Sequence, residues 1–205
     1  GGMSYGQNGH GPHVLTGLAA DDGLRTFGYD SNGNLTGDGR SATMSWDPKD
    51  RLIGAAEDGV THSHIYDYAS QRRIHTQTKD GKISQTYYID DVSEFRDGRL
   101  VKYIYVGSEK VARSDFSGTS GSAIAPDRFY LHNHLGSTTV ALDPDGQVTQ
   151  ISSHTPYGHD RLKGLSPAKQ IDYSFSGKEL HEGPDLAYFE TRFLSSGQAR
   201  FTQPD

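Results

Sequence analysis

Short stretches of alternating side chains recur along this chain. In the segment KYIYV at 102–106, Tyr103 and Tyr105 would point to one face of a strand while Ile104 and Val106 point to the other. Similar windows rich in Val, Ile, Tyr, Phe and Thr follow one another at intervals of about 20 residues. No window before residue 160 has the three- and four-residue apolar spacing that a helix requires. The pattern predicts a mainly β protein of stacked antiparallel hairpins.

Asp-Gly pairs separate these windows. They occur at residues 22–23, 38–39, 58–59, 80–81, 97–98 and 145–146. Asp-Gly tolerates positive φ at both central positions of a two-residue turn, which a type I′ hairpin requires. We therefore expect a hairpin corner at each pair.

In several windows an aromatic residue comes one or two positions before an aspartate. The examples are Tyr29-Asp30, Trp46-Asp47, Tyr66-Asp67 and Tyr88 before Asp90. A periodic aromatic position is typical of a repeat in which each hairpin packs on the next. About ten such strands are expected from the spacing of the turns.

Differences in composition and motifs divide the chain into four predicted segments. Residues 1–13 are predicted to form a flexible arm, 14–113 the hairpin repeats, 114–126 a Ser/Gly-rich loop and 127–205 a C-terminal region with different motifs. A second loop or irregular turn is expected at 159–170. The C-terminal third is predicted to be irregular.

Composition agrees with thin sheets and many turns. Leu, Ile, Val and Phe together supply 39 of the 205 residues, just under the level of about 20% at which disorder is suspected. The net charge of −6 is small, and aromatic residues reach 10%, with 12 tyrosines. Disordered chains are usually poor in aromatics, so we expect a folded chain with a lean core.

Several classes of protein are excluded by what the sequence lacks. With no cysteine, neither a disulfide framework nor a thiolate site can form. No run of 18 apolar residues occurs, so no membrane span is predicted, and the N-terminus lacks the pattern of a signal peptide. The pI of about 5.9, without a basic block, argues against nucleic acid as a partner.

The motifs of the second half resemble the core-associated end of the Rhs / YD-repeat family. The residues that carry the resemblance are Tyr130, His132, His134–Ser137, Asp143, Asp145-Gly146, Pro156–Gly158, Phe175–Glu179, Leu186, Tyr188-Phe189, Arg192, Gly197 and Arg200-Phe201. The segment YDSNGNLTGDGR at 29–40 resembles the repeat itself. The similarity extends over roughly residues 12–205.

The resemblance implies a fold and a role. In this family, hairpins join into a spiralling sheet that forms a shell, and bacterial members carry a C-terminal toxin inside it. A chain of this length is expected to be a structural part of such a shell, from a secreted or cell-surface bacterial system. Its partners would be the rest of the shell and the toxin payload.

The same resemblance implies a self-cleaving protease of aspartyl type near the C-terminus. Arg192 and Asp205 match the family's functional arginine and its first aspartate. The second aspartate and the scissile bond would lie beyond Asp205, so the catalytic set is incomplete. Since two carboxylates are needed to activate water in such a site, we expect no self-cleavage by this chain. Ser195-Ser196 and Gln198-Ala199 depart from the family's usual pattern.

Ten histidines raise the question of a metal site. His132 and His134 form an H-x-H pair whose rings would share one face of a strand, and His62 and His64 repeat the spacing. A zinc site needs a third ligand, for which the candidates are His154 and His159. The alternative is that His and Asn in HNHLGS hold a tight connection between strands. We favour this alternative and expect neither a metal nor another cofactor.

Motifs of other enzyme classes are absent. The sequence contains neither a phosphate-loop nor a serine-hydrolase motif, so no other enzymatic activity is predicted. Tyrosine rows could instead bind carbohydrate or a protein partner, as in an adhesion module, although packing between hairpins explains them more simply. Unpaired strand edges at the ends of the sheet predict a dimer formed by edge pairing.

Overall fold

The computed structural model describes residues 2–7, 9–20, 23–116, 126–164 and 171–204. The described part of the chain contains 21 strands and one short 3₁₀ turn, so the mainly β prediction is confirmed. The prediction of an irregular C-terminal third is wrong, because seven of these strands lie between residues 138 and 201, where they find pairing partners. The strands are two to eight residues long, which is why they are about twice as numerous as the turn spacing suggested. No helix in the described residues has the length and apolarity needed to cross a membrane.

One large antiparallel sheet of 14 strands dominates the molecule, and its strands follow one another in sequence order from β4 to β17. Its strands are β4 (Gly28–Tyr29), β5 (Leu35–Gly37), β6 (Thr43–Trp46), β7 (Leu52–Glu57), β8 (Val60–Tyr66), β9 (Arg72–Lys79), β10 (Lys82–Tyr88), β11 (Ser93–Arg96), β12 (Arg99–Val106), β13 (Glu109–Phe116), β14 (Arg128–His132), β15 (Thr138–Leu142), β16 (Val148–His154) and β17 (Asp160–Gly164).

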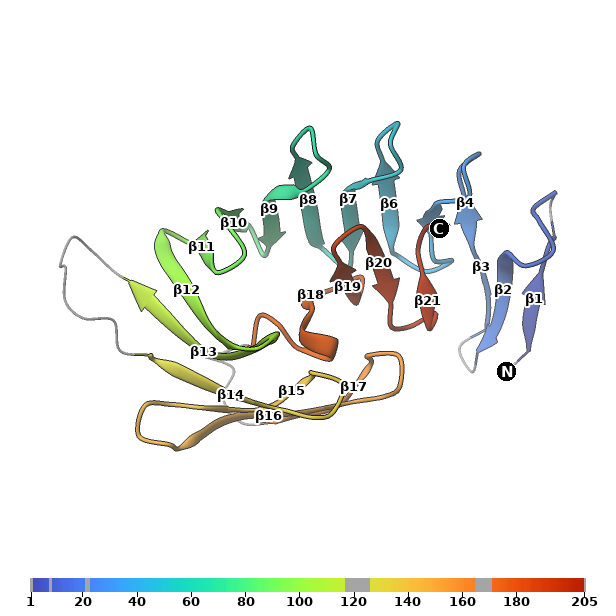
Figure 1. Ribbon diagram of the computed structural model, residues 1–205. Coiled ribbons are helices and arrows are strands. Elements are labelled where there is room, and N and C mark those ends of the chain that lie inside the picture. Colours follow the sequence, from blue (N-terminus) through green and yellow to red (C-terminus); the bar gives the residue numbers. More distant parts are fainter. Residues whose placement is uncertain (1, 8, 21–22, 117–125, 165–170, 205) are drawn as a thin grey trace.

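Two smaller sheets flank the large sheet in the sequence. The N-terminal sheet contains β1 (Met3–Tyr5), β2 (Leu15–Ala20) and β3 (Gly23–Thr26). The C-terminal sheet contains β18 (Glu179–His181), β19 (Leu186–Phe189), β20 (Arg192–Ser195) and β21 (Arg200–Phe201), and it follows the 3₁₀ turn η1 (Phe175–Gly177). Figure 1 shows the large sheet curving round, with the C-terminal sheet lying inside the curve.

Three predicted segment boundaries differ from the structure. Strand β1 lies within the predicted arm and pairs with β2, because the backbone groups of an extended segment gain partners there. Strand β13 continues to Phe116 and so includes the start of the predicted Ser/Gly-rich loop, while 117–125 lie outside the described residues. Strand β17 occupies 160–164 of the second predicted loop, and 165–170 are not described.

The Asp-Gly corners of the described residues fall into two groups, while Asp22 of the first predicted corner lies outside the described residues. At Asp58-Gly59, Asp80-Gly81 and Asp97-Gly98 both residues have positive φ, as a type I′ turn requires. At residues 38–39 and 145–146 only the glycine does, so the type I′ prediction is wrong there. These two pairs lie in longer connections that are closed by an aspartate side chain.

Those longer connections share one hydrogen-bond pattern, which Asp47 illustrates. Its Oδ1 accepts from the backbone N–H groups of Lys49 (2.9 Å) and Arg51 (3.0 Å), and its own N–H donates to the Arg51 carbonyl (3.0 Å). The same side-chain contacts to the second and fourth following residues recur at Asp30, Asp38, Asn133 and Asp143. The aspartate of the repeat is therefore a turn-forming residue, and Asn133 has the same role in HNHLGS.

The aromatic residue before the aspartate links neighbouring hairpins. In three repeats its polar atom donates to the carbonyl of a buried leucine in the preceding repeat. The contacts are Tyr29 Oη to Leu15 O (2.7 Å), Trp46 Nε1 to Leu35 O (2.7 Å) and Tyr66 Oη to Leu52 O (2.8 Å). Each ring thus covers apolar surface while its polar tip is satisfied, which makes a thin sheet rigid.

The main apolar core lies between the first half of the large sheet and the C-terminal sheet. It contains Leu15, Phe27, Leu35, Met44, Leu52, Ala55, Leu186 and Phe193. Hydrogen bonds to backbone carbonyls secure the far end of the C-terminal segment, where the Leu35 N–H donates to the Thr202 carbonyl (2.7 Å) and the side-chain Nε2 of Gln203 donates to the Asp50 carbonyl (3.1 Å). At its near end, the Thr138 N–H donates to the Ser174 carbonyl (3.0 Å).

Candidate functional site: a buried polar interface

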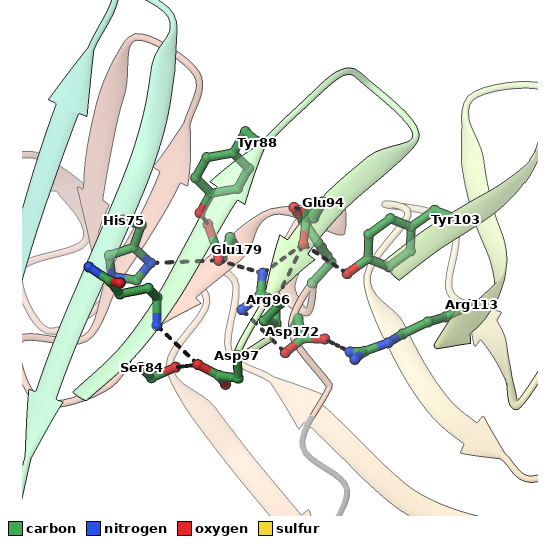
Figure 2. A network of polar contacts seen from close by, with 12 residues as sticks. His75, Ser84, Tyr88, Glu94, Arg96, Asp97, Tyr103, Arg113, Asp172 and Glu179 are labelled. Carbon is green, nitrogen blue, oxygen red and sulfur yellow. Dashed lines mark hydrogen bonds and ion pairs between the residues drawn. The ribbon is translucent and has the colours of Figure 1, made fainter. Parts of the chain in front are cut away.

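Beyond the apolar core, the interface between the large sheet and the C-terminal segment is polar. Figure 2 shows it as a network of charged and tyrosine side chains from β9–β13 and from the segment around β18. Charged residues are almost never fully buried unless they are paired. A group of them at one junction therefore marks a place where the structure depends on specific contacts.

Glu179, the first residue of β18, lies at the centre of the network with a side chain only 4% exposed. One carboxylate oxygen, Oε2, accepts from Arg72 Nη2 and from the Tyr88 hydroxyl (2.5 Å). The other, Oε1, accepts from Arg96 Nη2 (2.9 Å) and lies 3.8 Å from His75 Nδ1. Four residues of β9, β10 and β11 thus converge on one carboxylate of the C-terminal sheet.

The electrostatics of Glu179 show how strongly it is held. Burial alone would raise the pKa of this carboxyl, but the neighbouring Arg72, His75 and Arg96 side chains hold it well below its ordinary value. Burial also raises the pKa of the Tyr88 phenol well above its ordinary value. Glu179 is therefore a carboxylate, and Tyr88 a neutral donor, across the physiological pH range.

A second carboxylate, Glu94 on β11, continues the network along the sheet. It accepts from Arg96 Nη2 (3.0 Å), from the Tyr103 hydroxyl (3.3 Å) and from the Tyr173 hydroxyl. Tyr173 belongs to the C-terminal segment, so Glu94 forms a second link between the two parts.

Asp172 of the C-terminal segment forms the third link. Its carboxylate bonds to Arg113 of β13 and lies 3.6 Å from Arg96 Nη1. Arg113 is also bound by its neighbour Asp115. Arg96 therefore touches three carboxylates, two of which come from the C-terminal segment.

Four histidines lie beside this network at the same junction. His62 and His64 on β8, His75 on β9 and His181 on β18 are all buried, with exposures of 3%, 4%, 7% and 1%. Their ring centroids lie within 4.3–5.2 Å in the contacting pairs. Phe193 of β20 packs on His64 and His181, with centroids 5.3 Å apart in each case.

The arrangement is suited to holding two parts together rather than to catalysis. Each carboxylate of the network is occupied by arginine or tyrosine donors from the protein itself. A buried ion pair costs several kcal/mol when one partner is removed, because the other charge is left uncompensated. The network therefore ties the segment around β18 to one position on the large sheet.

The structure leaves the predicted protease residues untested. Arg192 begins β20 and its guanidinium carbon lies 3.9 Å from the centre of the Phe201 ring. Asp205 lies outside the described residues, so the two cannot be placed relative to each other.

The structure places the two predicted histidine pairs in different surroundings. His132 ends β14, His134 is exposed in the turn that follows, and neither joins a group of three potential metal ligands among the described residues. His154 contacts Ser174 Oγ (2.8 Å), and the exposed His159 lies in another turn. His62 and His64, by contrast, do share one face, and the fold brings His75 and His181 to them.

Sequence reasoning missed most of the network. In the sequence, Glu179 and Tyr88 stand out only as parts of motifs, and Arg72, Glu94, Arg96, Arg113 and Asp172 belong to no motif. Their contacts with the C-terminal segment join residues 59–109 positions apart, so local spacing carries no sign of those contacts. The one available signal is charged and histidine residues at strand positions where alternation calls for a buried face.

Comparison with known proteins gives a likeness of fold. No family model and no curated protein matches the chain. Among solved structures, a Photorhabdus luminescens Tc holotoxin pore with a mutated TccC3 is similar over 99% of this chain, with a TM-score of 0.70 and 16% identity. Crystal structures of TcdB2-TccC3 and of TcdB2-TccC3-Cdc42 are similar over 89%, with TM-scores of 0.65 and 0.63 and identities of 17% and 16%.

This chain spans 12% of the length of each of those chains. At such low identity the likeness concerns the fold, and it extends over both the large sheet and the C-terminal sheet, since nearly the whole chain is aligned. The chain thus has the mainly β fold of a portion of a toxin-complex component.

Proposed function

We propose that this chain is a wall segment, with the inner end attached, of an Rhs / YD-repeat shell that encloses and delivers a C-terminal toxin. The large sheet is the wall, and the C-terminal sheet is the inner end that leads towards the payload. The observation that carries the proposal is the C-terminal sheet lying inside the curve of the large sheet, joined to it by the buried network around Glu179. The partners are the remaining shell and its payload, in a secreted bacterial toxin system.

Cysteine labelling tests the proposal, because the chain has no cysteine of its own. Glu190 lies in the exposed turn after β19 on the C-terminal sheet, and its side chain is 79% exposed. Ser63 is exposed on β8 and points to the opposite face of the large sheet from the buried His62 and His64. We expect the Glu190→Cys variant of the parent protein to resist a bulky maleimide while the Ser63→Cys variant reacts.

In the isolated 205-residue chain both variants should react, because no further wall covers the inner side. Rapid labelling of the Glu190→Cys variant in the parent protein would contradict an enclosed position. If the cysteine at position 63 resists the maleimide and the cysteine at position 190 reacts, the enclosed side is the face of the large sheet that carries Ser63.

The self-cleavage part of the proposal concerns residues beyond this chain. Arg192 and Asp205 would act only with a second aspartate supplied by the following residues, so this chain alone should not cleave itself. Mass spectrometry of a version extended by the residues that follow Asp205 in the parent tests this. Cleavage of the extended version that Asp205→Asn abolishes supports the assignment, and cleavage that persists in Asp205→Asn removes it.

Carbohydrate binding and edge-pairing dimerisation have less support. The aromatic residues before Asp30, Asp47 and Asp67 donate hydrogen bonds inside the sheet, so they are not a free stacking surface. A glycan array and light scattering over a range of concentrations check the two ideas. A glycan hit that is lost on Tyr68→Ala, a 94% exposed ring, would restore the binding hypothesis.

A further inference from the structure

Hydrogen bonds fix where the protons lie on two of the four buried histidines, His62 and His181. Arg72 Nη1 can only donate, so His181 Nε2, at 3.0 Å, accepts and its proton is on Nδ1. The Glu182 carbonyl can only accept, so His62 Nε2, at 2.8 Å, donates to it. In neutral His62 the Nδ1 atom then accepts from His75 Nε2, 2.9 Å away. The contact of Arg72 with His181 therefore requires a neutral His181 ring, and the bond from His75 requires a neutral His62 ring, whereas the His62 bond to the Glu182 carbonyl is kept in either charge state.

An added proton has no favourable place on three of these rings. A second proton on His181 would face the Arg72 guanidinium, and one on His62 Nδ1 would face the N–H of His75 as long as His75 carries its proton on Nε2. Both nitrogens of His64 are buried without a hydrogen-bond partner in the described part of the chain. Charge on His64 would therefore be unsolvated and close to the other rings.

We propose that His62, His64 and His181 form a proton-sensitive latch, which holds the C-terminal sheet on the large sheet at neutral pH and weakens its hold on acidification. The inference rests on the contacts within this chain and does not depend on the proposed role in a shell. His75 differs from the other three, since a proton on its Nδ1 would face Glu179 Oε1 at 3.8 Å.

The charged groups around the latch set the direction of its response. The large sheet contributes the Arg72 guanidinium, which opposes a further positive charge on the rings. It also contributes Tyr88 on β10 and Arg96 on β11, which both bind the Glu179 carboxylate. The C-terminal sheet contributes Glu179, with Tyr188 stacked on Arg72 and the apolar Phe193 on the rings. Lys79 and Glu182 form an exposed pair at the rim.

The titration behaviour agrees with this geometry. Burial, followed by neighbouring positive charges, holds the pKa of His64 and of His181 well below the ordinary value. Burial lowers the pKa of His62 to about 4. A group whose folded pKa is depressed binds protons better when released, so its contribution to attachment is present above about pH 6.5 and is lost as the pH falls.

Between pH 7.5 and 5.5, each such imidazole raises the detachment equilibrium by roughly 10-fold. Glu57 acts in the opposite direction. It lies at the same interface, where burial and then the Asp38, Asp58 and Asp185 carboxylates raise its pKa to about 7, so acidification neutralises it in the attached state. The comparison of variants below cancels this opposing contribution.

A metal ion does not fit the same rings as they stand. Nitrogen atoms of His62, His75 and His181 lie within 4.8 Å of one another. However, an imidazole holds a metal in the plane of its ring, and His62 and His181 are stacked with planes only 9° apart. The His62 and His75 nitrogens that face each other are joined by a hydrogen bond, and His181 Nε2 is engaged by Arg72.

The test measures hydrogen exchange of the β18–β20 amides in the 205-residue chain at pH 7.5 and 5.5, corrected for intrinsic exchange, with β14–β16 as an internal reference. Acidification should increase opening of β18–β20 more than that of the reference. His64→Phe keeps a ring against Phe193 and removes the titrating group, so its pH effect should be roughly 10-fold smaller. His134→Gln, at an exposed turn, is the matched control and should behave as wild type.

Three outcomes would overturn the latch. Equal loss of protection in β14–β16 would indicate global unfolding. An unchanged pH effect in His64→Phe would remove the histidines as its cause. A pH effect that disappears in chelator, with protection increased by added zinc, would replace the latch by a metal site.

Discussion

Two halves of one interface hold the C-terminal sheet by different physics. On the side of β2–β7, Leu186 and Phe193 pack into an apolar cluster with buried leucines of the repeats. On the side of β9–β13, Glu179 and its neighbours form charge-assisted hydrogen bonds with Arg72 and Arg96. The free energy of apolar burial in the first half is non-directional and roughly proportional to the buried area. The free energy of the hydrogen bonds in the second half depends on distance and angle.

The difference suggests a division of roles. Apolar burial supplies attachment, and it tolerates small shifts in position. Buried ion pairs contribute little net stability compared with apolar packing, but a misplaced partner is strongly penalised. We therefore expect the polar half to determine where the segment around β18 sits, and the apolar half to determine how tightly the sheet is held.

The largest effect is expected at the centre of the polar half. Glu179→Gln keeps the shape but leaves the Arg72 guanidinium, whose side chain is 3% exposed, without its carboxylate, at a cost of about 3–5 kcal/mol. Urea unfolding measures this. The matched control is Glu182→Gln, which breaks an exposed pair with Lys79 and should cost less than about 1 kcal/mol. Similar losses for both would contradict the special role of the polar half.

The apolar half should respond to volume and not to chemical detail. Leu186 is fully buried, so Leu186→Ala is expected to cost about 3 kcal/mol through lost burial and a cavity. Leu186→Met conserves volume and should cost less than about 1.5 kcal/mol. If Leu186→Met proves as damaging as Glu179→Gln in the same unfolding experiment, the two halves do not differ in the way described.

A smaller effect is expected within the large sheet itself. Tyr66→Phe removes the hydroxyl that donates to the Leu52 carbonyl and should cost about 1 kcal/mol, the usual net value of one hydrogen bond. Tyr68→Phe provides the control, since Tyr68 is 94% exposed. Thermal unfolding of the two variants would separate a role in the repeat from an unspecific effect of losing a hydroxyl.

The smallest effect concerns Glu57 on β7, a carboxyl group in the apolar half whose pKa is strongly raised. With its folded pKa of about 7 above an unfolded value of about 4.3, the folded state binds the proton more tightly, and stability from this group falls as the pH rises between the two values. Glu57→Gln should match wild type near pH 4.5 and exceed it at pH 8. Because the site is partly solvated, the gain should stay below about 1 kcal/mol, and a loss at pH 8 would contradict it.

Local sequence patterns determined the secondary structure and the turns. Alternation at 102–106 and positive-φ corners such as Asp58-Gly59 depend on residues a few positions apart, so the sequence alone reveals them. The turn-forming role of Asp47 was not predicted, although its contacts are equally local. The paired β1 and the continuation of β13 escaped prediction, because glycine- and serine-rich segments become strands only when a neighbour offers backbone partners.

The polar interface was decided by tertiary structure. Glu179 meets Arg72 and Tyr88 across about 90–110 positions of chain, and the curvature that brings them together is a property of the whole sheet. His62 and His64 could be recognised as a pair on one face, but their partners His75 and His181 come from another strand and another sheet. The sequence thus sets which strands and corners form, since those energies are local, while the long-range packing of the last 30 or so residues decides which buried charges and rings meet.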